Sequence, residues 1–135
     1  MNRWLGKYEN IAYALIRLVA GLLLACHGAQ KLLGVPGAKA TVHDPLLIVA
    51  GIIELVGGLA IAAGFQASSA AFIVSGELAV AYFKMHFPRG FWPILNGGEL
   101  AVLYSFLFLY IATHGSGTWS LDHLLEKWVG RRHSV

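Results

Sequence analysis

Four long apolar segments, separated by short polar connections, dominate this sequence. Each is close to the roughly 20 residues with which an α-helix crosses a bilayer, and none alternates apolar and polar residues as a barrel strand would. They cover about residues 10–33, 45–64, 67–86 and 94–113. The pattern therefore predicts an all-α fold: an integral membrane four-helix bundle, in a single transmembrane domain over residues 1–135.

A polar tail follows the fourth segment. Ser120 is a suitable N-cap, and the sequence LDHLLEKWVGRR that follows it is amphipathic. The residues that would share its apolar face are Leu121, Leu124, Leu125 and Trp128. The tail therefore predicts a short C-terminal surface helix, over about residues 120–130, lying at the membrane interface.

The composition supports a membrane protein. Hydrophobic residues make up 57% of the chain and charged residues 13%, with a mean hydropathy of +0.64, whereas soluble domains carry about 25% charged residues. The basic residues flank the apolar segments and form no run, so no nucleic-acid partner is predicted. The single cysteine, Cys26, excludes an intrachain disulfide and a cysteine cluster. In the fourth segment Phe106, Phe108 and Tyr110 are expected to face lipid.

Four spans would place both termini on the same side of the membrane. The basic residues expected there are Arg3, Lys7, Lys127, Arg131 and Arg132, against Lys31, Lys39, Lys84 and Arg89 in the opposite loops. This five-to-four balance favours termini in the cytoplasm, because cytoplasmic segments carry the excess of Lys and Arg.

Three ionisable residues fall inside the apolar segments near a common depth, if the helices are straight and antiparallel. They are Arg17, Glu54 and Glu77. A charge in a span costs about 2.5–3.5 kcal/mol on insertion scales, so such residues normally pair in the bundle interior. We therefore predict a buried polar triad. Its role is either to fix the helix register or to support a site, and the sequence leaves both open.

A second polar layer is predicted toward the connecting loops. The candidate catalytic residues are His27, His86 and Glu99, because imidazole and a buried carboxylate exchange protons near neutral pH. The candidate ligand-binding residues are Lys31, Lys84, Trp92 and Asn96, with Phe87, Phe91 and Trp92 as an aromatic roof. The simplest alternative for the lysines is snorkelling at helix ends. No His-x3-His spacing occurs, so no metal site is predicted.

Four sequence elements, taken together over about residues 10–115, resemble the DoxX family of small bacterial membrane proteins. They are R-x3-G-x5-HG-x2-K from Arg17 to Lys31, E-x2-GG-x5-G from Glu54 to Gly64, the run from Glu77 to His86, and NGGE from Asn96 to Glu99. The resemblance implies a four-helix bundle in the bacterial inner membrane. It also implies redox association, since the family takes its name from a subunit of a thiosulfate:quinone oxidoreductase.

The residues and the resemblance together favour a component of a quinone-linked oxidoreductase system, with a quinone or similar lipophilic aromatic in the loop-side pocket. The sequence has no haem, flavin or iron–sulfur motif, so electrons would need a soluble oxidoreductase partner. One alternative is a non-catalytic membrane anchor or assembly subunit for such an enzyme. Another is a small-solute transporter, which with four spans would need a homo-oligomer. The substrate and the electron donor stay open.

Overall fold

The structure is a computed structural model that describes residues 4–37 and 43–132, the side chains of 131 and 132 excepted. Two of the basic residues counted above, Arg3 and Lys39, lie outside the described residues, as do the side chains of Arg131 and Arg132. The long helices are α1 (Glu9–Leu33), α2 (Pro45–Ala63), α3 (Ala67–Ala81), α5 (Glu99–His114) and α6 (Leu121–Arg132). Short elements complete the order: 3-10 turns at Gly6–Tyr8 and Phe87–Arg89, a π-helical turn at Tyr82–His86, and α4 (Pro93–Asn96). The predicted all-α fold is confirmed.

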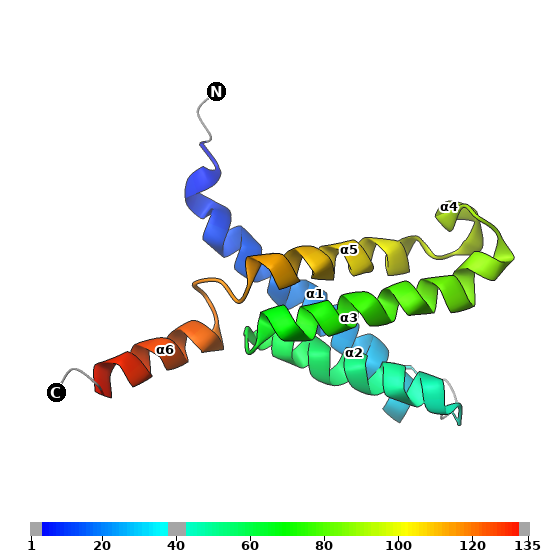
Figure 1. Ribbon diagram of the computed structural model, residues 1–135, viewed down its shortest axis with the longest axis horizontal. Helices are drawn as coiled ribbons and strands as arrows, with labels where there is room; N and C mark the ends of the chain where they lie inside the picture. The colour runs from blue at the N-terminus through cyan, green and yellow to red at the C-terminus, as the bar shows by residue number, and fades with distance from the viewer. Residues whose placement is uncertain (1–3, 38–42, 133–135) are drawn as a thin grey trace.

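Four of the long helices form two pairs. Helix α1 packs on α2, α3 packs on α5, and the contact of α2 with α3 joins the pairs. In Figure 1 the start of α1, the α2–α3 turn and α6 lie toward one end of the molecule, which we call the terminal end. The connection from α1 to α2 and the segment containing α4 lie toward the opposite end, which we call the loop end.

A seam of small residues brings α1 and α2 into backbone contact. A Cβ added at Gly21 would lie 2.6 Å from both the Ala62 nitrogen and the Gly58 oxygen. Nearer the loop end, Gly28 meets Gly51 and Leu55 in the same way. Small residues permit such close approach between membrane helices. The seam fixes the register of the pair and, through it, the level at which each polar residue of α1 lies.

The core is apolar and contains one residue that we predicted to face lipid. Phe108 is 0% exposed and packs with Leu24, Ile61 and Ile111. The prediction was wrong for Phe108 because residues two apart on a helix point to different sides. Phe106, at 68% exposed, and Tyr110 do lie on the surface.

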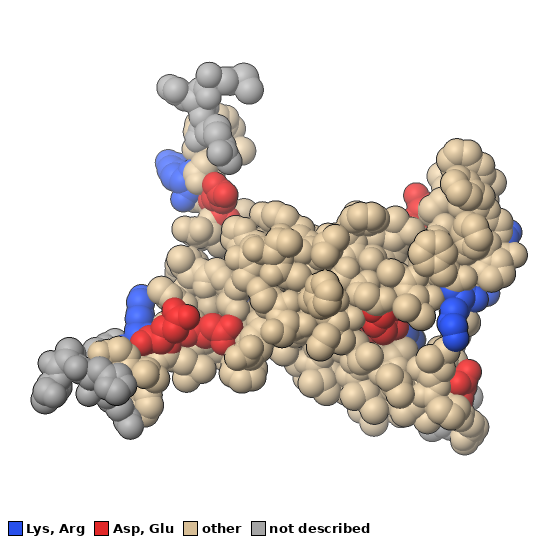
Figure 2. Space-filling view, viewed as in Figure 1, with Lys and Arg blue, Asp and Glu red and all other residues tan. Residues whose placement is uncertain are grey.

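Two described helices are long and apolar enough to cross a membrane: the segment Gly6–Leu33 and α2. Helix α5 is apolar but has 16 residues, and α3 has 15 before its π-helical turn. Large apolar side chains are exposed on all four of these helices, for example Leu22, Val56, Phe72 and Leu103. Figure 2 shows charged residues gathered near the two ends, with most of the visible face between them uncharged. Soluble monomers rarely expose so much contiguous apolar surface.

Helix α6 begins where the sequence predicts. The Ser120 hydroxyl accepts a hydrogen bond from the His123 backbone nitrogen at 3.2 Å, which confirms the N-cap. Asp122 fixes the helix to the α2–α3 turn, since its carboxylate accepts from the Gln66 nitrogen at 2.9 Å and its own nitrogen donates to the Gly64 oxygen at 3.1 Å. The four predicted apolar residues of α6 are all exposed. Its position at a membrane interface stays a prediction.

Candidate functional site

A pocket of about 630 Å³ lies between the two helix pairs, toward the loop end. Residues from α1, α2, α3, the π-helical turn and α5 all contribute to its lining. Its walls are mostly apolar, and Leu24, Leu78 and Tyr104 are buried parts of them. The polar residues that line it are His27, Lys31, Glu54, Glu77, Lys84, His86 and Arg89. It combines an apolar slot with several ionisable groups, as small-molecule sites do.

An ion pair between α1 and α2 forms one side of the pocket. Lys31 Nζ donates to Glu54 Oε1 at 2.7 Å, and the two side chains are 30% and 5% exposed. The pair forms because Gly28, three residues before Lys31, sits against the backbone of α2. The second carboxylate oxygen of Glu54, Oε2, is buried and has no hydrogen-bond partner in the part of the chain that the structure describes.

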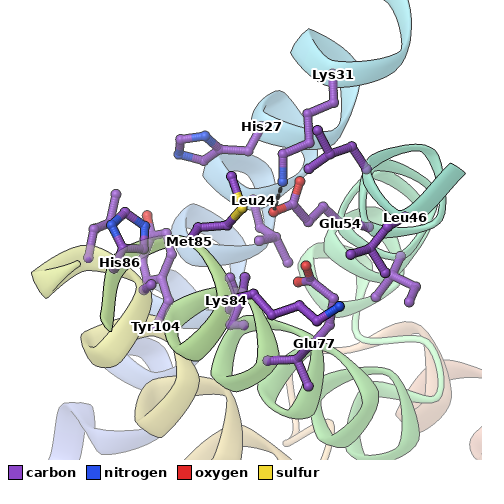
Figure 3. A pocket seen from close by; sticks show the side chains of 18 of the residues that line it. Leu24, His27, Lys31, Leu46, Glu54, Glu77, Lys84, Met85, His86 and Tyr104 are labelled. Atoms are coloured by element: carbon purple, nitrogen blue, oxygen red, sulfur yellow. Dashed lines mark hydrogen bonds and ion pairs between the residues drawn. The ribbon is translucent and has the colours of Figure 1, made fainter. Parts of the chain in front are cut away.

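Glu77 faces the same pocket from α3. Figure 3 shows its carboxylate and that of Glu54 directed into the same space, one from each helix pair. Oε2 of Glu77 is also buried and has no hydrogen-bond partner within residues 4–37 and 43–132. Two carboxylates and one bound ammonium therefore meet in an apolar environment, and two acceptor oxygens are left unused.

The π-helical turn Tyr82–His86 carries the residues on the other side of the pocket. Lys84, Met85 and His86 all line it. His86 Nδ1 lies 3.3 Å from the backbone oxygen of Asn96. π-Helical turns frequently occur at functional sites, where they redirect side chains. Here the turn presents Lys84, Met85 and His86 to the same cavity that α3 lines.

Asn96 is buried, but it organises the loop rather than lining the pocket. Its Nδ2 donates to the Gly90 oxygen at 2.8 Å, and its Oδ1 accepts from the Gly98 nitrogen at 2.8 Å. These bonds close the turn between α4 and α5. Asn96 therefore acts on the pocket through its backbone contact with His86.

The structure brings together four of the seven candidate site residues: His27, Lys31, Lys84 and His86 line the pocket. Glu99 does not; its side chain is exposed. Helix α5 begins at Glu99, and its pocket face consists of Leu100, Ala101 and Tyr104. Glu99 lies on the opposite side because a helix turns about 100° per residue. The prediction that Glu99 lines this site is corrected.

The predicted aromatic roof is also corrected. The rings of Phe87, Phe91 and Trp92 form a chain, with centroids 6.3 Å and then 5.2 Å apart. None of the three lines the pocket, and Trp92 is 63% exposed. They cover the outside of the loop between the π-helical turn and α4. Trp and Tyr are enriched at membrane interfaces, which suits this exposed position.

The predicted triad does not form, because Arg17 lies at the terminal end. Its Nη1 donates to the Ile61 oxygen at 2.7 Å and the Ala62 oxygen at 3.3 Å, and its Nη2 donates to the Trp119 oxygen at 2.6 Å. Gly64 ends α2 at φ 71°, and a Cβ there would collide with the Arg17 guanidinium. Arg17 thus satisfies carbonyls at the C-terminus of α2, where a cation is favourable.

The error lies in the register. We assumed that the first and second segments begin and end at the same levels. The small-residue seam instead sets Gly28 against Gly51, so Arg17, 11 residues earlier, lies about 16 Å along the helix from that level. Glu54 therefore forms its ion pair with Lys31 and not with Arg17. The sequence reasoning also missed Tyr104, Met85 and Arg89 as lining residues. For Tyr104, its spacing from Leu100 and Ala101 was the available signal.

Among residues 4–37 and 43–132, no group of three or more His, Cys, Asp or Glu is placed to hold a metal ion. The ionisable residues of the pocket are spread over both helix pairs, and the one close contact among them joins a lysine to a glutamate. The pocket therefore combines side chains that can donate hydrogen bonds with side chains that can accept them.

Comparison with known proteins identifies the family. The DoxX family model matches residues 12–87, more than half of the chain. The chain belongs to the DoxX family. An uncharacterised protein of Haemophilus influenzae is 44% identical over 130 residues, which cover 91% of this chain and 97% of that protein.

The inner membrane protein YqjF of Escherichia coli K12 is 28% identical over 131 residues, covering 90% of this chain and 97% of that protein. No solved structure matches the chain. Together with the apolar helices, these findings make the chain a multi-pass protein of the bacterial inner membrane.

Proposed function

We propose that this DoxX-family protein is a membrane component of a quinone-linked oxidoreductase system and binds a quinone or similar lipophilic aromatic in the pocket between its two helix pairs. In this proposal α1, α2, α3 with its π-helical turn, and α5 with the preceding loop cross the membrane as a four-helix bundle. The exposed apolar side chains on all four helices support that topology.

The proposed topology puts both termini in the cytoplasm. A cysteine at exposed Lys127, in a Cys26→Ala background, should react with a membrane-impermeant maleimide in inverted vesicles and stay unlabelled in intact spheroplasts. A cysteine at exposed Arg89 should show the opposite pattern. Labelling of both sites from the same side would contradict four spans.

The observation that carries the proposed ligand is the pocket's combination of an apolar, laterally exposed mouth with buried polar groups. Leu46, Val49, Ile73, Val80 and Leu100 line it and are exposed on the apolar surface. A ligand dissolved in the bilayer could therefore enter between the helix pairs with its alkyl chain in lipid. The volume of about 630 Å³ lies within the range of small-molecule sites.

The polar groups of the pocket suit the oxygen substituents of a quinone-type ring, since N–H groups donate to a carbonyl oxygen and carboxylates accept from a hydroxyl. His27 and His86 supply imidazoles, which exchange protons near neutral pH. Glu54 and Glu77 supply carboxylates from the two helix pairs. Electrons would pass to or from a separate soluble donor or acceptor, since the sequence offers no redox-cofactor motif. The chain would supply the lipid-side site of that system.

Binding of a decyl-substituted benzoquinone to the protein in lipid nanodiscs tests this function. We expect saturable binding that weakens by about tenfold or more in His86→Ala, since about 1.4 kcal/mol of lost contact is a tenfold change. The matched controls are Glu99→Gln and Trp92→Ala, which lie close in the chain but outside the pocket. Binding that is equal in all four proteins would refute the site.

A second function, anchoring of a soluble redox enzyme, is favoured by one observation. Helix α6 is held to the α2–α3 turn through Asp122, yet its apolar residues are exposed. In that case Leu125→Lys together with Trp128→Lys should abolish co-purification of a soluble oxidoreductase and leave ligand binding in the pocket unchanged. Retained co-purification in this variant would reject the anchor. Deletion of the whole polar tail after α5 is a poorer test of the anchor, because it also removes the Trp119 oxygen that accepts a hydrogen bond from Arg17.

A further inference from the structure

Two carboxylate oxygens inside the pocket are left without a hydrogen-bond donor. Oε2 of Glu54 and Oε2 of Glu77 are both buried and have no hydrogen-bond partner among the described residues. A buried acceptor without a partner costs about 1–3 kcal/mol, and more when it is charged. Two such atoms facing one pocket point to a ligand that donates hydrogen bonds.

The histidine of the π-helical turn contributes a third acceptor. A backbone carbonyl can only accept, so the contact between His86 Nδ1 and the Asn96 oxygen, at 3.3 Å, puts the ring hydrogen on Nδ1. In the neutral ring Nε2 then carries a lone pair. Because Asn96 is itself fixed to Gly90 and Gly98, this tautomer follows from the fold of the loop.

The cationic donors that line the pocket are Lys31, Lys84 and Arg89, of which the last two are exposed. Lys31 gives one hydrogen to Glu54 Oε1 at 2.7 Å, which leaves Oε2 of Glu54 facing the pocket as an acceptor. Lys84 lines the pocket, but its residue is exposed. Toward a bound ring, the buried part of the pocket therefore offers acceptors from α2, α3 and the π-helical turn.

We propose that the pocket selects the hydroxyl-bearing, reduced form of its ligand, a lipophilic hydroquinone, over the quinone. The two phenolic hydroxyls donate to acceptors on opposite helix pairs, Glu54 on one and Glu77 or His86 on the other. A quinone has only carbonyl acceptors, which cannot satisfy these atoms. This inference rests on the proposed function, which gives the pocket and the quinone-type ring of the ligand. It adds that the bound ligand is in its reduced form.

Three ligands of similar shape test the preference under anaerobic conditions, in nanodiscs. They are a decyl-substituted benzoquinone, the corresponding hydroquinone, and the dimethyl ether of that hydroquinone, which keeps the ring but has no donor. We expect the hydroquinone to bind at least about tenfold more tightly than either of the others, as the loss of one good hydrogen bond would give. Decylammonium is included because a cation could also satisfy carboxylates.

Glu77→Gln sharpens the test because the amide adds a donor at the same position. In this variant the ratio of hydroquinone to quinone affinity should fall by about five- to tenfold, whereas Glu99→Gln, outside the pocket, should keep the wild-type ratio. If Glu77→Gln does not fold, the ratio of hydroquinone to quinone affinity in the wild-type protein still decides whether the pocket prefers the reduced ligand.

The outcomes separate the two proposals. Quinone or dimethyl ether binding as tightly as hydroquinone would overturn the preference and leave the proposed function standing. Tighter binding of decylammonium than of any ring compound would overturn the preference in favour of a cationic ligand. Absence of saturable binding by all three ring compounds would refute the proposed function itself.

Discussion

The two ends of the protein use charge in opposite ways. At the terminal end, Arg17 is buried and its two terminal nitrogens bind three backbone oxygens, while its Nε has no hydrogen-bond partner among the described residues. At the loop end, Lys31 binds one oxygen of Glu54, and acceptors on Glu54 and Glu77 are left over. Both cations belong to α1. The two ends differ because Glu54 and Glu77 line a pocket, in which a ligand can use their acceptors, whereas Arg17 does not line it.

Substitution of Arg17 should have the largest effect on stability. Arg17→Met leaves the carbonyls of Ile61, Ala62 and Trp119 without their donor, and we expect a loss of about 3–5 kcal/mol in the free energy of unfolding. The measurement is unfolding in mixed micelles with increasing SDS. Lys7→Met removes an exposed cation at the same end and should change little. An Arg17→Met protein of wild-type stability would remove the contrast between the two ends.

The seam between α1 and α2 should come next. Gly21→Ala puts a Cβ 2.6 Å from the Ala62 nitrogen, so the helices must separate, at an expected cost of about 2 kcal/mol. Gly76→Ala is the matched control, because a Cβ there meets nothing within 4 Å. The same SDS unfolding measures both. Equal effects from the two substitutions would show that the close approach is not what holds the pair together.

The ion pair of the pocket should matter less to the fold. Glu54→Gln weakens the contact with Lys31, and we expect a loss of about 1–2 kcal/mol. Lys31→Met combined with Glu54→Leu should recover most of this stability, since replacing a buried pair with apolar groups is often neutral, yet the double variant should no longer bind ligand. A double variant that is less stable than Glu54→Gln would give the pair a structural role like that of Arg17.

The smallest effect on stability belongs to Glu77. Its Oε2 has no partner to lose, so Glu77→Gln should change the free energy of unfolding by no more than about 0.5 kcal/mol in the destabilising direction. Hydroquinone binding should nevertheless weaken severalfold. Isothermal unfolding and ligand titration on one preparation measure the two quantities together. A large loss of stability with unchanged binding would reverse our assignment of this residue.

The sequence allowed most of the fold to be predicted, because four apolar segments and the Ser120 cap are local signals. The depth of charged residues depends on how helices are offset, and that offset is set by contacts such as Gly28 with Gly51. The predicted triad requires all apolar segments to begin and end at the same depth in the membrane. Because they do not, Arg17 does not reach Glu54 or Glu77. The offset also explains why the Lys31–Glu54 pair was not foreseen.

The loop side of the site was harder to predict for a second reason. The π-helical turn Tyr82–His86 changes which residues face the cavity, and nothing in the apolar pattern marks it. Glu99 was assigned by its depth alone, although the first turn of α5 points it outward. Depth and residue type identified His27, Lys31, Lys84 and His86 as neighbours. Whether the other candidates line the pocket depends on the direction in which each side chain points from its helix or loop.

Photo-crosslinking tests most directly whether the loop end is the ligand site. An azido-benzoquinone with a decyl chain, irradiated with the protein in nanodiscs, should label peptides from residues 46–54 and 73–86, which line the pocket. Excess unlabelled hydroquinone should displace this labelling. Labelling spread over lipid-facing residues such as Leu103 and Phe106, or over α6, with no displacement by competitor, would contradict the account.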